Sequence, residues 1–468
     1  MDKYDLIVIG TGPAGEKAAV KAAYFHYKVA IIEKAIRYGG AGVNTGTLPS
    51  KTLKETSLYL SGKYDQGLYG IDRNIEEAMS IKTFMYRKNW IIETESNAVR
   101  NNLIRHGVDI YHGEASFLDA NTIKITKEEE TILLKASYII IATGSYPFHP
   151  KTIPFDGVRI HDSDMILNIT HYPLSLAVLG AGVIGCEYAT IFSTSGTKVS
   201  LINRNENILP FIDQQIVRNF IESMQNDHID LLFNQSIAKI EPPSKPEEKV
   251  KLIFKSGGVL STDMFLFAAG RNGNTKALHL DRIGITVTSR ETIPINENYQ
   301  TVVPNIYAVG DVIGFPALAS AGMDQGRIAV AHIFHTKDIE EIARIFPYGI
   351  YTIPEISTAG ISEEEAKQKG FAYATGVAYH KDMPRGKIMG IEKGLLKLIF
   401  SRDDLVVQGV HIIGPLATEL IHHGVGLIEG KRTILDIIGK VYNHPTLHDL
   451  YKYAAYDGLG NVSGYKIK

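Results

Sequence analysis

Two turns in this chain share the spacing Gly-x-Gly-x-x-Gly. Each stands between a short apolar run and a helical pattern, and a second apolar run follows the helix. Such glycines permit a tight turn and a close approach of backbone to a pyrophosphate, whose charge is stabilised at the helix N-terminus. The two sets are Gly10, Gly12 and Gly15, and Gly180, Gly182 and Gly185.

The two turns belong to units with the same register. Gly10 to Glu33 is 33 - 10 = 23 residues, and Gly180 to Asn203 is 203 - 180 = 23 residues. One such turn alone can be a strand-to-helix connection without a ligand. Two copies in βαβ context with equal spacing predict that the chain binds two dinucleotides.

The residue that ends each unit should select the ribose. Glu33 suits free ribose hydroxyls, as in the adenosine half of FAD or NAD. The second unit has Asn203 and Arg204 instead, which removes a negative charge and offers a guanidinium to a 2′-phosphate. We expect NADP(H) to be accepted there; the alternative is that Arg204 is an ordinary solvated arginine after a strand.

Two further strand ends carry polar residues. In "PNIYAVGDVIG" the apolar run ends at Gly310-Asp311, where the carboxylate could receive the hydroxyls of a ribityl chain. The alternative is a plain acidic turn residue. "YIIIATGSYP" places Thr143 and Gly144 after another buried strand.

Composition excludes several classes of function. Lys+Arg 49 against Asp+Glu 51 gives a net charge of -2, which favours neither nucleic acid nor an anionic membrane as a partner. The apolar runs fall short of the roughly 18 residues that a membrane span requires. With one cysteine, Cys186, no intrachain disulfide and no cysteine-based metal site can form. We expect a cytoplasmic protein whose partners are small molecules and copies of itself, with no bound metal.

The order of motifs along the chain resembles the FAD-dependent pyridine nucleotide-disulfide oxidoreductases. The strings that carry the resemblance are "GTGPAG", "LPSK", "ATG", "GAGVIGCE", "AGRN", "YAVGD" and "HPT". "GSYPFHP" and "GIYTIPEIS" are more similar to the transhydrogenase branch than to lipoamide dehydrogenases. The resemblance implies an α/β fold with two Rossmann-like dinucleotide-binding domains, for FAD and NAD(P), plus a C-terminal α+β dimerisation domain. The implied ranges are 1–150 and 273–346 for FAD, 151–272 for NAD(P) and 347–468 for the interface of a homodimer or higher homo-oligomer.

The resemblance also assigns residues to sites. Lys51 would lie beside the flavin N5 atom and pair with Glu187. The implied FAD set is Gly10, Gly12, Gly15, Glu33, Lys34, Gly40, Gly42, Thr47, Lys51, Thr143, Gly144, Asp311 and Ala319. The implied nicotinamide nucleotide set is Gly180, Gly182, Gly185, Glu187, Asn203, Arg204 and Gly270.

The stretch "GGAGVNTGTLPSKTLKE" departs from the disulfide reductases of this family. They keep cysteines where this chain has Gly42 and Thr47, and the transhydrogenases usually keep the first of the two. Thiol-disulfide exchange requires a thiolate, so no disulfide relay can operate here. We expect a glycine-rich loop followed by a helix that begins near Pro49 and directs its amides at the flavin ring. The expected activity is FAD-dependent hydride transfer between NADPH and NAD+ in a ping-pong sequence.

Two other features, the pair His444 and Asp449 and the single Cys186, have competing interpretations. His444 and Asp449 stand where disulfide reductases hold a His-carboxylate pair, so they are candidate catalytic residues. Thr446 and Asp449 also fit a capping box at the start of a helix. Cys186 follows a helix N-terminus that could lower the pKa of a thiol, but a small core residue is the simpler interpretation.

Three other functions stay open. A dihydrolipoamide dehydrogenase-like enzyme is favoured by His444 and opposed by the missing sulfurs. An NAD(P)H oxidase or diaphorase would pass electrons to oxygen or a quinone. A non-catalytic nucleotide-sensing flavoprotein would bind nicotinamide nucleotides without bleaching the flavin.

Overall fold

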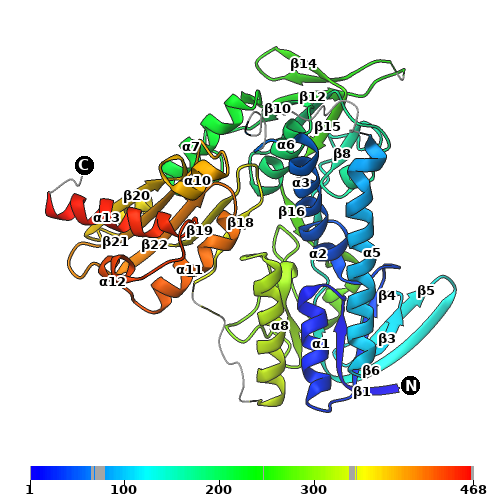
Figure 1. The fold of residues 1–468 in the computed structure, drawn as a ribbon. Helices are drawn as coiled ribbons and strands as arrows, with labels where there is room; N and C mark the ends of the chain where they lie inside the picture. The colour runs from blue at the N-terminus through cyan, green and yellow to red at the C-terminus, as the bar shows by residue number, and fades with distance from the viewer. Residues whose placement is uncertain are drawn as a thin grey trace. The chain divides into compact units, whose positions relative to one another are not determined.

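The computed structural model describes residues 2–64, 68, 80–245, 247–336, 343 and 345–464 (Figure 1). The chain divides into two compact units. The first contains Met1–Thr52, Met85–Pro150 and Gly270–Ala343. The second contains Leu53–Phe84, Lys151–Ala269 and Arg344–Lys468. Each unit therefore combines segments that lie far apart in the sequence.

The first unit is built on a sheet of order β3-β2-β1-β6-β5-β4, with β17 beside β6. Its strands are β1 (Asp2–Ile9), β2 (Val29–Glu33), β3 (Asp109–His112), β4 (Glu114–Asp119), β5 (Thr122–Lys127), β6 (Glu130–Ile141) and β17 (Ile306–Ala308). The pairs β3-β2, β2-β1, β1-β6 and β6-β17 are parallel, whereas the pairs β6-β5 and β5-β4 are antiparallel and extend the sheet. A separate ribbon pairs β7 (Ser145–Pro147) with β16 (Arg271–Gly273).

Strand β1 is apolar on both sides because both faces of this sheet are covered. Leu6 and Val8 pack with three helices, and Ile7 and Ile9 pack with the antiparallel extension. The helices are α1 (Pro13–Tyr24), α5 (Ile81–Arg105) and α8 (Ala319–Phe334), and α8 lies alongside α1 (Figure 1). α2 (Gly40–Asn44) and α3 (Thr47–Ser61) follow β2 in the chain.

The second unit contains a parallel sheet of order β11-β10-β9-β15-β8. Its elements are β8 (Ile160–Asp162), β9 (Ser175–Leu179), α6 (Val183–Thr194), β10 (Lys198–Ile202), α7 (Gln214–Asn226), β11 (Asp230–Leu232) and β15 (Met264–Phe267). An antiparallel sheet joins β12 (Ile237–Glu241), β13 (Val250–Phe254) and β14 (Val259–Thr262). β9, α6 and β10 repeat the order of β1, α1 and β2, and both strand pairs are parallel.

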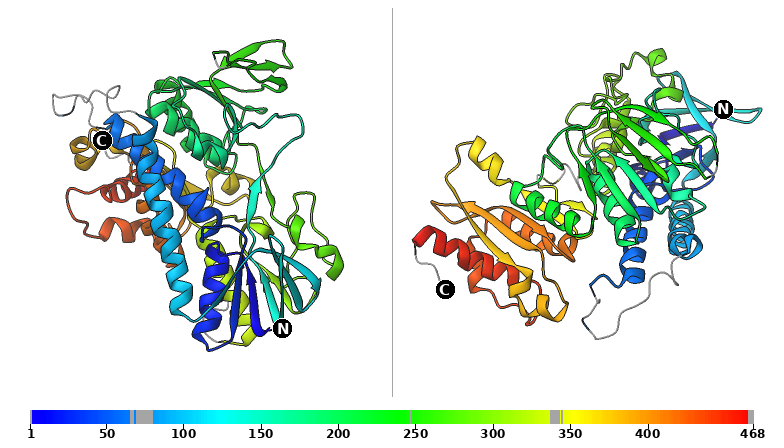
Figure 2. Two further views of the ribbon diagram at one scale, coloured as in Figure 1. Left: turned by 90° about the vertical axis from the view of Figure 1, so that its right-hand side faces the viewer. Right: turned by 90° about the horizontal axis from the view of Figure 1, so that it is seen from above.

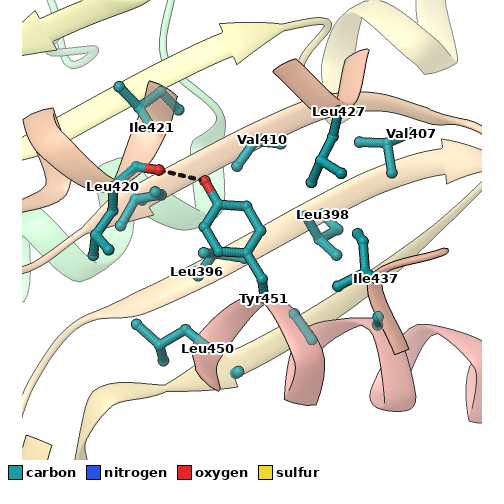
Figure 3. Packing of buried hydrophobic residues seen from close by; sticks show 14 of the residues in the cluster. Leu396, Leu398, Val407, Val410, Leu420, Ile421, Leu427, Ile437, Leu450 and Tyr451 are labelled. Carbon is teal, nitrogen blue, oxygen red and sulfur yellow. Dashed lines mark hydrogen bonds between the residues drawn. The ribbon is translucent and has the colours of Figure 1, made fainter. Parts of the chain in front are cut away.

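The rest of the second unit is an antiparallel sheet of order β18-β19-β22-β21-β20 with helices packed on it (Figure 2). Its strands are β18 (Tyr348–Ile350), β19 (Ile356–Gly360), β20 (Tyr373–Tyr379), β21 (Leu395–Ser401) and β22 (Val407–Ile413). Its helices are α9 (Glu363–Gln368), α10 (Pro384–Ile388), α11 (Ala417–Glu429), α12 (Ile434–Gly439) and α13 (Asp449–Ser463). Buried Tyr451 of α13 packs among the aliphatic side chains of this core and donates its hydroxyl to Leu420 O at 2.7 Å (Figure 3).

The architecture confirms the expected α/β class with two parallel-sheet Rossmann-type arrangements and a C-terminal α+β part. One local expectation was wrong. The residues expected to form a loop after Gly39 include the one-turn helix α2, whereas the helix expected near Pro49 is α3, which begins at Thr47.

Candidate functional site

The first glycine turn lies where β1 meets α1. Gly10 has φ +105°, a conformation that favours glycine, and its N–H donates to Ile32 O at 2.8 Å. A Cβ on Gly15 would lie 2.0 Å from Gly10 O, so only glycine lets α1 start this close to the strand. Gly12 caps α1 without a side-chain hydrogen bond, which leaves the first-turn amides available to a phosphate.

The second glycine turn, between β9 and α6, reproduces this geometry. Gly180 has φ +112°, and its N–H donates to Ile202 O at 2.9 Å. A Cβ on Gly185 would lie 1.8 Å from Gly180 O. Gly182 caps α6 without a side-chain hydrogen bond, and a Cβ added there would meet no atom within 4 Å. Both turns therefore have the shape expected of a pyrophosphate site.

Glu33 ends β2 beside the first turn. Its side chain is buried, Oε2 accepts from the N–H and hydroxyl of Thr11, and Oε1 accepts from Ala35 N at 2.9 Å. These bonds orient the carboxylate at the strand end, and its remaining lone pairs can accept ribose hydroxyls. The adjacent Lys34 is mostly exposed and lies 3.8 Å from the Glu114 carboxylate.

Some buried side-chain polar atoms of the first unit have no hydrogen-bond partner within the described ranges, and two of them lie beside strand or helix ends. These two are Thr143 Oγ1, after β6, and Asn44 Oδ1, at the end of α2. Asp311 follows β17, the strand that pairs with β6. Its Oδ2 accepts a hydrogen bond from the Ser145 hydroxyl at 2.9 Å. Unsatisfied buried polar atoms are costly, so Thr143 Oγ1 and Asn44 Oδ1 favour a ligand that supplies their partners.

These observations fit FAD in the first unit. The sequence reasoning included Thr143, Gly144 and Asp311 but missed Asn44. Gly144 has φ +69°, which suits the tight turn expected after β6. Ala319 begins α8, whose cap residue, Leu318, makes no side-chain hydrogen bond to the first turn.

Gly42 lies in α2 against the ring of Pro13. A Cβ on Gly42 would lie 2.9 Å from Pro13 Cγ and 3.3 Å from Pro13 Cδ. The close packing of α2 on the start of α1 is therefore matched to glycine. This gives a physical reason for the absence of the first cysteine that the sequence alone could not provide.

We expect the Gly42→Cys variant to be less stable than the parent by about 1–2 kcal/mol, because overpacking a filled site forces neighbouring atoms to move. The measurement is chemical denaturation of the FAD-loaded protein. Thr47→Cys is the matched control, since Thr47 is exposed and the exchange should change stability by less than about 0.5 kcal/mol. Equal stability of Gly42→Cys and the parent would contradict the packing argument.

The two predicted catalytic residues beside the flavin lie on different helices. Lys51 is half-buried in α3, and its Nζ donates to Ser50 Oγ at 3.3 Å. Glu187 is buried in α6, and its Oε1 accepts from Tyr351 N at 3.0 Å. The two residues belong to different compact units, so their pairing stays a prediction.

The residues that follow β10 lack a carboxylate at the strand end. Asn203 Nδ2 donates to Asn205 O at 2.9 Å and to Asn207 O at 3.1 Å, which closes a turn after the strand. Arg204 in this turn is exposed. Gly270 has φ +127°, and its carbonyl accepts from Phe148 N at 3.1 Å.

The structure brings His444 and Asp449 together. His444 Nδ1 lies 3.0 Å from Asp449 Oδ2, and the His444 side chain is 65% exposed. The capping-box alternative was wrong. α13 begins at Asp449 with His448 as a cap that makes no side-chain bond, and Thr446 Oγ1 has no partner within the described residues.

Cys186 is a core residue of α6. Its side chain is fully buried, and burial, followed by the charge of Glu187, raises the pKa of the thiol well above its ordinary value. The thiol is therefore not activated for redox chemistry. Within the described ranges, no group of three or more His, Cys, Asp or Glu side chains is placed to hold a metal ion.

These features define a class of oxidoreductases that use two dinucleotides. The features are two glycine turns on separate sheets, buried polar atoms without hydrogen-bond partners in the unit of the first turn, and a C-terminal α+β part. The chain belongs to the pyridine nucleotide-disulphide oxidoreductase family. The model for that family matches residues 4–326, and the model for its dimerisation domain matches residues 346–455. The family is FAD-dependent and uses NAD(P)H, and the matched dimerisation domain indicates a homo-oligomer.

Curated relatives extend over nearly the whole chain. A soluble pyridine nucleotide transhydrogenase of Mycobacterium bovis is 39% identical over 99% of this chain and 98% of its own length. One from Pectobacterium atrosepticum is 38% identical over 98% of each chain. The crystal structure of LpdA from Mycobacterium tuberculosis matches with a TM-score of 0.89 at 24% identity, covering 97% of this chain and 99% of that one, which supports the fold. No helix of the described residues is long and apolar enough to span a bilayer.

Proposed function

We propose that this protein is an FAD-dependent transhydrogenase that transfers hydride between NADPH and NAD+ without a redox disulfide. The supporting observation is that the only thiol of the chain is buried in α6, while Gly42 and Thr47 occupy the positions of the redox cysteines. The full-length similarity to soluble transhydrogenases favours nicotinamide nucleotides as both donor and acceptor.

In the proposed enzyme the first unit holds FAD. The uncapped N-terminus of α1 binds the pyrophosphate, Glu33 accepts ribose hydroxyls, and Asp311 accepts hydroxyls of the ribityl chain. Thr143 and Asn44 gain hydrogen-bond partners. When bound, FAD supplies the two-electron hydride chemistry that amino-acid side chains lack.

The second unit holds NADP(H) or NAD(H) in turn. The N-terminus of α6 receives the pyrophosphate, and Arg204 pairs with the 2′-phosphate of NADP(H). The proposal also includes the domain boundaries: FAD is bound by residues 1–150 and 273–346, NAD(P) by residues 151–272, and residues 347–468 form the interface. We further propose that the protein is a homodimer in the cytoplasm.

The decisive test is anaerobic and uses the purified FAD-loaded protein. We expect NADPH to bleach the flavin absorbance and a thio-analogue of NAD+ to restore it, with parallel double-reciprocal plots at steady state. Dihydrolipoamide is the comparison substrate and should reduce NAD+ poorly. Failure of the NAD+ analogue to restore the absorbance would rule out transhydrogenation.

One observation favours a second candidate, a dihydrolipoamide dehydrogenase-type enzyme. His444 and Asp449 form the hydrogen-bonded pair that would move a proton during thiol chemistry. Faster turnover with dihydrolipoamide than with the NAD+ analogue would support this candidate. We propose instead that this pair belongs to a transhydrogenase site that contains no thiols. The rate with dihydrolipoamide, compared with the rate with the NAD+ analogue, distinguishes the two candidate functions.

Removing Arg204 should weaken NADPH selectively. A charge-assisted hydrogen bond contributes about 1.5–3 kcal/mol, so Arg204→Ala should raise KM for NADPH about ten- to a hundredfold and leave KM for NADH unchanged. The measurement is steady-state kinetics with both coenzymes. Exposed Arg218 lies on α7, and Arg218→Ala is the control. An unchanged preference for NADPH would show that Arg204 is only a solvated residue.

Lys51 should stabilise negative charge that develops during the first half-reaction. We expect Lys51→Met to slow flavin bleaching by NADPH about ten- to a hundredfold, because one preorganised charge is lost from the site. Stopped-flow absorbance measures the rate, and binding of NADPH is measured separately. A bleaching rate equal to that of the parent would exclude this role.

A further inference from the structure

A groove of about 770 Å³ in the first unit lies outside both sets of proposed coenzyme residues. One wall is a stripe of α5 that includes Glu93, Ser96, Arg100 and Ile104. The spacing i, i+3, i+7 and i+11 places these residues along one side of the helix. The facing wall comes from residues 36–38, after β2, and from β3; α5 and β3 are labelled in Figure 1. The volume falls in the range of small-molecule sites, about 300–1,000 Å³.

Two arginines line this groove. Arg37 comes from the segment after β2 and Arg100 from α5. Neither guanidinium makes an ion pair or hydrogen bond with any residue that the structure describes. Burial, and then the positive charge of Arg37, lower the pKa of the neighbouring Lys88 to about 8. Guanidiniums that make no ion pair within the protein favour a phosphate group.

The other lining residues suit a body larger than phosphate. Ile36 is 94% exposed and Ile104 is 50% exposed, so both present apolar surface that a flat ring could cover. Glu93 lines the groove without a partner among the described residues, and Asp109 accepts from the Tyr4 hydroxyl at 2.8 Å. Carboxylates repel a bare polyanion, but they accept the hydroxyls of a ribose.

We propose that this groove binds a purine nucleoside monophosphate. Arg37 and Arg100 bind the phosphate, one groove carboxylate, Glu93 or Asp109, accepts ribose hydroxyls, and an exposed isoleucine, Ile36 or Ile104, covers the base. The proposal does not depend on the transhydrogenase reaction.

The groove is connected to the first glycine turn through residues after β2. Tyr38 N donates to Ser96 Oγ at 2.8 Å, and the Tyr38 hydroxyl lies 2.6 Å from His112 Nε2. The next residue, Gly39, donates its N–H to Thr11 Oγ1 at 3.1 Å. A ligand on Arg37 would therefore stabilise the segment that leads to Gly40, and by linkage it would tighten FAD binding.

The test is titration calorimetry on the FAD-loaded protein with excess NADP+ to occupy the second unit. The probes are adenosine monophosphate, adenosine and inorganic phosphate. We expect adenosine monophosphate to bind more tightly than either fragment, and Arg37→Ala/Arg100→Ala to lose about tenfold or more in affinity. Arg105→Ala, at the end of α5 and outside the groove, should bind like the parent.

Three results would overturn the proposal. They are no binding of adenosine monophosphate to the parent, equal binding by the double arginine variant, and binding only after FAD is removed, which would assign the groove to the adenine end of the flavin. Circular dichroism and flavin content establish that the variants are folded. If the double variant fails to fold, Arg37→Gln and Arg100→Gln tested singly must each weaken binding.

Discussion

Replacing Gly185 with alanine is expected to reduce kcat/KM for NADPH by at least about 100-fold, which corresponds to about 2.7 kcal/mol of lost transition-state stabilisation. The added Cβ would lie 1.8 Å from Gly180 O, where no backbone can accommodate it. α6 must then move away from β9, and the pyrophosphate loses both the tight turn and the helix amides.

The same variant should keep its FAD, since Gly185 belongs to the second glycine turn. Gly15→Ala makes the opposite case, because its Cβ would lie 2.0 Å from Gly10 O in the first turn, and it should be purified with little flavin. Gly426→Ala controls for adding a methyl group within a helix, since its Cβ would meet no atom within 4 Å. Visible absorbance and coenzyme titrations measure both sites, and loss of FAD from Gly185→Ala would contradict the separation of the two turns.

Lys397→Met is expected to lower the free energy of unfolding by about 3–5 kcal/mol, because it leaves buried negative charge uncompensated. Lys397 and Asp213 are 1% and 0% exposed, and Nζ donates to both Asp213 oxygens at 3.0 and 2.8 Å. It also donates to Glu363 Oε2 at 2.6 Å. Asp213 caps α7 by accepting from Gln215 N at 2.9 Å, so the loss extends to that helix.

Chemical denaturation measures the effect, and Lys367→Met is the matched control. Lys367 pairs with the same Glu363 at 2.9 Å but is 60% exposed, so its removal should cost less than about 1 kcal/mol. Lys397→Met/Asp213→Asn should recover part of the loss. Equal stability of Lys397→Met and the parent would show that the buried cluster is dispensable.

The cluster also predicts how stability changes with pH. Burial favours a higher pKa for Glu363, but hydrogen bonds from Lys397 and Lys367 and the charge of Lys397 outweigh it and lower the pKa to about 2. A lowered carboxyl pKa stabilises the fold above the unfolded value near 4.5, and this contribution disappears as the pH falls toward 2. Lys397→Met should weaken this acid dependence.

The residues of the two coenzyme turns could be predicted because their constraints are local. Gly10 needs a positive φ, and Gly15 lies against Gly10 O. Both constraints arise within the short segment from Gly10 to Gly15, so the spacing of the glycines alone reveals them. The same holds for the strand-end residues Glu33 and Asn203. The start of α13 was harder to predict from the sequence. Thr446 and Asp449 match a capping pattern, but in the folded chain the Asp449 carboxylate is hydrogen-bonded to His444.

Local patterns in the chain were enough to predict that two dinucleotide turns exist, that their strand ends differ in charge, and that the redox disulfide of the family is absent. Four features became visible only in the folded chain: Gly42 packs against Pro13, Asn44 and Thr143 have unsatisfied atoms, Arg37 and Arg100 line one groove, and Lys397 is buried with Asp213. Each of these depends on contacts between residues tens or hundreds of positions apart. No local pattern records such contacts, because burial and the meeting of charges are set by the packing of whole elements.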